Sequence, residues 1–92
     1  MRKLVMLAAA LAATGGLVAT AQAGSLGRPC TSAPASEWLS IDALRARAEA
    51  DGYRVQKAKI KDACGEIYAL DRSGTRVELF VDPTSGRIVA TQ

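Results

Sequence analysis

The sequence contains no histidine, and this absence excludes more chemistry than any other feature of its composition. Histidine is the commonest general base and the commonest metal ligand, and it activates serine and cysteine nucleophiles. The carboxylates do not replace it, because no segment resembles the Asp-x-Asp-x-Asp-Gly calcium loop. We therefore expect a protein that is not an enzyme and that has no cofactor and no metal site.

Long apolar runs are almost as scarce, and the one present lies at the amino terminus. Met1-Arg2-Lys3 gives a cationic start, an apolar stretch follows over residues 4–18, and Ala21-Gln22-Ala23 has the small-x-small pattern of a signal peptidase site. A transmembrane helix needs about 20 apolar residues, more than this run supplies. We predict a signal peptide over residues 1–23, cleavage after Ala23, a periplasmic or secreted location, and no membrane insertion afterwards.

An excess of one charge is also missing once the signal is discounted. Arg2 and Lys3 are two of the 12 basic residues, so ten remain against nine acidic ones. A domain this close to neutrality gives little reason to expect nucleic acid or an anionic membrane as its partner.

Cysteine is limited to two residues, Cys30 and Cys64. In an exported chain of this size, an even pair favours a disulfide over free thiols, and the loop it closes is worth roughly 3 to 4 kcal/mol in the chain-entropy model. A redox pair or a metal site is the alternative. Both are disfavoured because the spacing is far from Cys-x-x-Cys and no histidine completes a zinc site.

The remaining sequence predicts an α+β domain with one helix packed on a small antiparallel meander of three to four strands. Residues 24–37 indicate an extended arm, and residues 38–92 the domain. Ser40 is a helix cap, Leu39 can pack onto Leu44, and Asp51-Gly52 ends the helix. Strands are expected near residues 53–60, 66–71, 75–82 and 87–91.

Two turns fix the strand register. Closure of one turn on Asp71 and Thr75 pairs Ala69 with Val77 and Ile67 with Leu79, and closure of the other on Asp82 and Arg87 pairs Val81 with Ile88. The face that the helix should cover then collects small and aliphatic side chains. Its expected members are Ile67, Ala69, Val77, Leu79, Val81, Ile88 and Ala90.

The opposite face is expected to carry apolar side chains as well, namely Tyr68, Leu70, Phe80 and Val89. Exposed apolar side chains gathered on one face often mark a binding site, so these four residues are our candidate partner-binding face. The alternative is that the arm, tethered through Cys30 and carrying Trp38, covers it as a second small core, and the sequence favours this cover over a partner.

Charged side chains on the strands have ordinary interpretations. Lys57, Lys59 and Lys61 alternate, so they share one face, where they suit either an acidic partner or a solvated surface that discourages aggregation. The solvated surface is the simpler interpretation. Five carboxylates at turns or on solvent-facing strand positions are expected to be scattered surface charge: Asp62, Glu66, Asp71, Glu78 and Asp82.

The run from Trp38 to Val89 resembles the PepSY domain family in its short stand-alone periplasmic form. The matching pieces are Trp38-Leu39, Gly52-Tyr53-Arg54-Val55, the run 64–69, the run 76–83, and Gly86-Arg87-Ile88-Val89. The resemblance implies a helix-plus-sheet module outside the cytoplasm that binds or restrains peptidases or serves an envelope sensor, with no catalytic residues to carry over. One departure is Gly65, because family members commonly have an aromatic residue directly after the second cysteine.

Two functions follow. The first is an exported, non-catalytic binding module for a protein or peptide in the cell envelope, with a peptidase as one candidate, contacted through a sheet edge or the face of Tyr68 and Phe80. The second is a small thiol-redox or metal-responsive periplasmic protein that uses Cys30 and Cys64.

Overall fold

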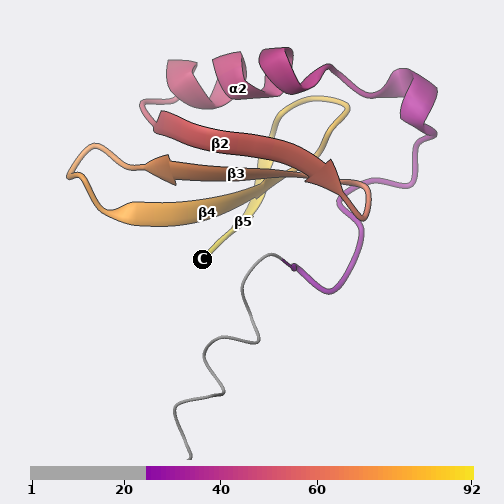
Figure 1. Cartoon of the computed structure of the whole chain (residues 1–92). Coiled ribbons are helices and arrows are strands. Elements are labelled where there is room, and N and C mark those ends of the chain that lie inside the picture. The colour runs from indigo at the N-terminus through magenta and orange to yellow at the C-terminus, as the bar shows by residue number, and fades with distance from the viewer. Residues whose placement is uncertain (1–24) are drawn as a thin grey trace, which may run out of the picture.

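The computed structural model describes residues 25–92 (Figure 1). Within them lie a short 3-10 helix, one α-helix and four strands. The predicted signal peptide and its cleavage after Ala23 fall outside the described residues. The predicted α+β class is confirmed, as is the single antiparallel sheet with strand order β2-β3-β4-β5.

Helix α2 (Ile41–Ala50) begins and ends where the sequence indicates. The Ser40 hydroxyl accepts a hydrogen bond from the amide of Ala43, which satisfies one of the free donors of the first turn. Gly52, with φ of +100°, follows the last turn in the left-handed region that ends helices. Leu44 and Ala48 form the buried side of α2 and point it toward the sheet.

The strands form a meander in which each strand pairs with the next. They are β2 (Arg54–Lys61), β3 (Cys64–Leu70), β4 (Arg76–Val81) and β5 (Ile88–Thr91). Both predicted turns are confirmed, because Asp71 N–H donates to Thr75 O and Asp82 N–H donates to Arg87 O, each at 2.9 Å. The predicted pairs Ala69–Val77, Ile67–Leu79 and Val81–Ile88 are likewise observed.

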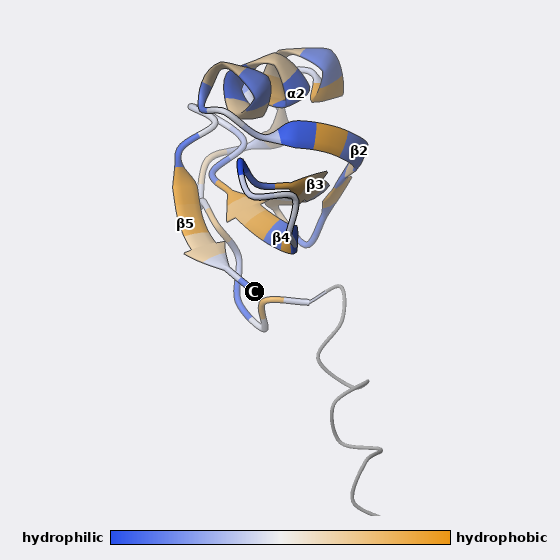
Figure 2. Cartoon of the chain, turned by 90° about the vertical axis from the view of Figure 1, so that its left-hand side faces the viewer, coloured by the Kyte–Doolittle hydropathy of each residue, from blue (hydrophilic) through white to orange (hydrophobic). Residues whose placement is uncertain are grey.

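The main core lies between α2 and one face of the curved sheet, which we call the inner face. Figure 2 shows the four strands as an arc with α2 across its open side. The buried cluster consists of Leu44, Ala48, Ile67, Ala69, Leu79 and Val81. Leu39 and Ile88 pack against it from the two ends of the chain, so the helix and the sheet share one core.

Two irregularities that were not predicted change the bounds or the facing of predicted residues. Asp62 and Ala63 connect β2 to β3 with φ of 53° and 60°, so β3 starts at Cys64 rather than at residue 66. The second is a bulge in β5, which pairs Ile88 with Val81 but Ala90 with Phe80 and leaves Val89 as the extra residue. The prediction that Ala90 shares the helix-covered face is therefore wrong, because the bulge breaks the two-residue alternation.

The segment before α2 crosses to the other side of the sheet. It has no regular structure before the 3-10 helix η2 (Ala35–Glu37), and Leu39 N–H donates to Pro83 O at its α2 end. Figures 1 and 2 show it running past the β2–β3 turn to the side of the sheet that α2 does not cover. We call residues 25–37 the arm.

Candidate functional site

The face of the sheet away from α2, which we call the outer face, carries the residues predicted to meet a partner. Alternation along β3 and β4 places two sets of side chains there: Cys64, Glu66, Tyr68 and Leu70 on β3, and Arg76, Glu78 and Phe80 on β4. The β2 pairs Lys57–Tyr68, Lys59–Glu66 and Lys61–Cys64 bring the three alternating lysines to the same face, as predicted. The outer face is therefore both aromatic and charged.

A disulfide fastens the arm to this face. Cys30 and Cys64 are joined with a Cα–Cα distance of 4.9 Å, as the sequence favours. Beside the bond, Cys30 N–H donates to Ala63 O at 3.2 Å, and the Cys64 Sγ lies 3.6 Å from the carbonyl oxygen of Arg28. Cys64 is only 1% exposed, whereas Cys30 on the arm is partly exposed.

The predicted partner-binding face is divided by this arrangement. Phe80 is 0% exposed, so its ring belongs to a second small core and is not available to a partner. Tyr68 and Leu70, farther from the disulfide, are half-buried and reach the surface. Val89 is half-buried at the bulge of β5. Of the four predicted residues, Tyr68 and Leu70 are therefore the ones that still offer a contact surface on the outer face.

Two carboxylates expected at the surface are buried instead. Glu66 is 1% and Glu78 8% exposed, because they flank Phe80 and Tyr68 on a face that the sequence alone treats as solvent-facing. Glu66 Oε1 accepts no hydrogen bond from residues 25–92 and lies 3.9 Å from Lys59 Nζ. Burial raises the pKa of the Glu66 carboxyl; Lys59 opposes that rise and Glu78 adds to it.

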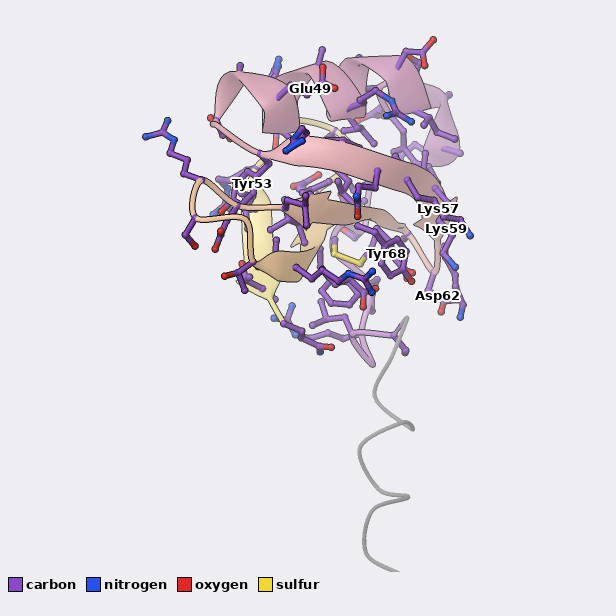
Figure 3. All side chains as sticks on the ribbon, turned by 60° about the vertical axis from the view of Figure 1, so that its left-hand side comes forward. Glu49, Tyr53, Lys57, Lys59, Asp62 and Tyr68 are labelled. Carbon is purple, nitrogen blue, oxygen red and sulfur yellow. A yellow bond between two sulfur atoms is a disulfide. The ribbon has the colours of Figure 1, made fainter. Side chains whose placement is uncertain are left out.

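Tyr68 connects the two carboxylates and the lysine row. It lies opposite Glu78 in the β3–β4 register, and the Glu78 carboxylate accepts a hydrogen bond from its hydroxyl. Burial raises the pKa of Tyr68, and the negative charge of Glu78 raises it further. Lys59 Nζ lies 5.8 Å from the ring centroid, within cation–π range. Figure 3 shows Lys57, Lys59 and Tyr68 together on one side of the molecule.

A hollow of about 260 Å³ opens beside Tyr68. The side chains of Gln56, Arg76, Glu78 and Gln92 border it along with Tyr68. Gln56 is the extra residue of a bulge in β2, and Gln92 is held in place by mutual backbone hydrogen bonds with Glu78, each 2.9 Å long. The hollow is large enough for a side chain and offers polar groups around an aromatic wall.

No group of three or more histidine, cysteine, aspartate or glutamate side chains within residues 25–92 is placed to hold a metal ion. No helix within this range has the length and apolar character needed to cross a bilayer. The arrangement on the outer face can bind, through a ring, an amide-lined hollow and fixed charges.

Comparison with known proteins gives one finding. The family model described as "Peptidase propeptide and YPEB domain" matches residues 4–92. No curated protein and no solved structure matches the chain. Since the family model covers nearly the whole sequence, the chain belongs to the PepSY family of peptidase propeptide and YPEB domains.

Proposed function

We propose that the protein is an exported, non-catalytic binding module that contacts a protein or peptide of the cell envelope through the exposed part of its outer face. Domains of this family are propeptide-like modules associated with peptidase regulation, and they are typically extracellular or periplasmic. A peptidase, or an envelope sensor that this module assists, is therefore the first partner to consider.

The observation that carries the proposal is the half-buried pair of Tyr68 and Leu70 beside a side-chain-sized hollow. Aromatic side chains with one apolar and one polar end are favoured at protein interfaces. Tyr68 is held from both sides, by the Glu78 carboxylate and by Lys59, so it is ordered before a partner arrives. Such preorganisation reduces the entropy lost on binding.

The proposal includes the processing of the chain. Residues 1–23 serve as the signal, residues 24–37 are the amino-terminal segment that contains the arm, and residues 38–92 form the PepSY domain. The disulfide supports an oxidising compartment, where such bonds persist.

The redox alternative is disfavoured by the burial of Cys64. A disulfide that exchanges with other thiols must be open to attack, and with Cys64 1% exposed only the partly exposed Cys30 offers such a position. Mass spectrometry of the native protein after mild reductant separates the two functions. We expect the bond to survive without copurified metal, and a readily reduced bond would favour the redox function.

Pull-down from periplasmic extract tests the binding function. We expect the wild-type protein to retain a partner and Tyr68→Ser to lose it, because the serine removes the ring that borders the hollow. Ile41→Ser is the matched control, since Ile41 is a 40% exposed apolar residue on α2, away from the outer face. A captured peptidase would then be assayed with added protein. Equal capture by folded Tyr68→Ser, or no capture at all, would contradict the proposal.

A further inference from the structure

On the outer face, the basic side chains lie at the surface and the acidic side chains are buried. Its basic side chains are exposed at the surface, with the Lys59 side chain at 39%. The strand register assigns five to this face: Arg54, Lys57, Lys59, Lys61 and Arg76. The carboxylates of the same face are the buried Glu66 and Glu78. A molecule approaching from solvent therefore meets cations first.

The exposed acidic residues lie mostly elsewhere. Glu37, Asp42, Glu49 and Asp51 belong to η2, α2 and the residue that caps α2. Figure 3 shows Glu49 on α2, well away from Lys57 and Lys59, with Asp62 at the β2–β3 turn as the acidic neighbour of the lysines. The surface of the outer face is therefore mainly basic, whereas α2 carries both signs, with Arg45 and Arg47 beside its acidic residues.

The hollow beside Tyr68 lies within this basic surface. Arg76 borders it, and a guanidinium can hold a carboxylate by two parallel hydrogen bonds. Gln56 and Gln92 border it too, as does Glu78, whose carboxylate accepts a hydrogen bond from the Tyr68 hydroxyl. Along β2, alternate residues repeat at about 6 to 7 Å, which is also the repeat of alternate side chains in an extended peptide.

We propose that the outer face binds an extended acidic segment of a partner protein, with one carboxylate against the exposed Arg76 at the mouth of the Tyr68 hollow and others along the lysine row. This inference rests on the proposed binding function and adds the chemistry of the partner. An anionic membrane fits less well. Insertion into the interface needs exposed apolar side chains, whereas Phe80 is fully buried and Tyr68 and Leu70 are half-buried.

The test measures fluorescence anisotropy with a labelled ten-residue peptide of alternating glutamate and valine, added to protein expressed from the full sequence. A peptide with lysine in place of glutamate and vesicles containing phosphatidylglycerol are the comparison probes. We expect the acidic peptide alone to bind, and its affinity to fall as salt rises. The double variant Lys57→Glu/Arg76→Glu should bind it roughly tenfold more weakly or worse.

Arg87→Glu is the matched control, because Arg87 is an exposed arginine in the loop whose Ser85 carbonyl contacts Arg47 of α2, on the other side of the sheet. It should bind the acidic peptide like the wild type. Equal binding of the acidic and basic peptides, an equal loss in Arg87→Glu, or binding to vesicles alone would each overturn the inference. If a captured partner depends on Tyr68 but not on Lys57 and Arg76, the binding function stands and the acidic partner is wrong.

Discussion

Asp62 and Ala63 both adopt left-handed backbone conformations without being glycine. A two-residue hairpin turn of this kind needs φ above zero at both central positions, which is why Asn-Gly and Asp-Gly are its usual sequences. Aspartate tolerates the conformation because its short polar side chain can hydrogen-bond locally. Alanine has no such hydrogen bond to offset the steric clash of its Cβ. The sequence predicted a longer connection between residues 60 and 66, because Asp-Ala is a weak signal for a two-residue turn.

Ala63→Gly should therefore stabilise the protein. We expect the free energy of unfolding to rise by about 0.5 to 1 kcal/mol, since the relief of strain exceeds the extra freedom that glycine has in the unfolded chain. Urea denaturation measures the change. Ala46→Gly, on the exposed side of α2, is the control and should lower stability by about 1 kcal/mol. A loss in both variants would show that Ala63 is not strained.

Glu66 should give stability an unusual dependence on pH. Its folded pKa is raised by burial, so folding takes up protons there; the stabilisation is present below the unfolded pKa and is lost as pH rises through the folded value. Glu66→Gln removes this dependence. We expect its stability relative to wild type to improve from pH 4 to pH 7, measured by urea denaturation at each pH.

Asp71 provides the opposite case and serves as the control. The hydroxyl of Ser73 and the amide of Thr75 donate to its carboxylate, which lowers the pKa of Asp71. Its stabilisation is present above the unfolded pKa and is lost as pH falls through the folded value. The loss of unfolding free energy caused by Asp71→Asn should therefore be smaller at acidic pH than at neutral pH. Equal pH profiles for the two variants would contradict the assignment of Glu66.

At the level of elements, the sequence correctly predicted the helix start, the turns and the strand register that depend on a few neighbouring residues. Ser40 begins α2, and Asp71 and Asp82 set the two later turns, so three cross-strand pairs followed from turn geometry alone. The position of Ala90 could not be predicted, because a bulge depends on how β5 meets β4 rather than on its own residues. The burial of Glu66 could not be predicted either, since it depends on the path of the arm.

Gly65 shows how closely α2 packs against the sheet. A Cβ there would lie 2.5 Å from Val81 Cγ2 and 3.1 Å from Leu44 Cδ1. The aromatic residue that the resemblance leads one to expect at this position has no room in this chain, because Val81 and Leu44 already occupy the space. Close packing on the inner face therefore explains why glycine, rather than an aromatic residue, follows Cys64.

Gly65→Ala should destabilise the protein by about 1 to 3 kcal/mol, because an added methyl group overpacks the contact with Val81. In Gly65→Ala/Val81→Ala the smaller partner makes room, so the loss should be less than the sum of the single losses by about 1 kcal/mol. Urea denaturation of the four proteins measures this. The stability losses of Gly65→Ala and the distant Ala46→Gly should add when the two are combined. If the losses of Gly65→Ala and Val81→Ala also added, direct contact between positions 65 and 81 would be contradicted.

At the level of the whole molecule, a disulfide joins the arm to the outer face, the face on which Phe80 is buried. The residues of the arm are largely exposed and have no periodic pattern, so its path could not be read from sequence beyond the tether at Cys30. The structure nevertheless confirms that the disulfide forms and shows Phe80 fully buried. Of the predicted partner-binding residues, Phe80 is therefore enclosed and Tyr68 reaches the surface, while cover by the arm stays a prediction.

The disulfide should hold the arm in place, because few backbone bonds join the arm to the sheet near Cys30. We expect Cys30→Ala/Cys64→Ala to lose roughly 3 to 4 kcal/mol of unfolding free energy. Before unfolding, the arm should detach and the emission of Trp38, whose indole N–H donates to Ala33 O, should shift to the red. Ser40→Ala is the control, since losing the α2 cap costs about 1 kcal/mol without freeing the arm. The measurement is made at a denaturant concentration where Cys30→Ala/Cys64→Ala is still folded. Unchanged Trp38 emission in that double variant would mean that packing, rather than the disulfide, holds the arm in place.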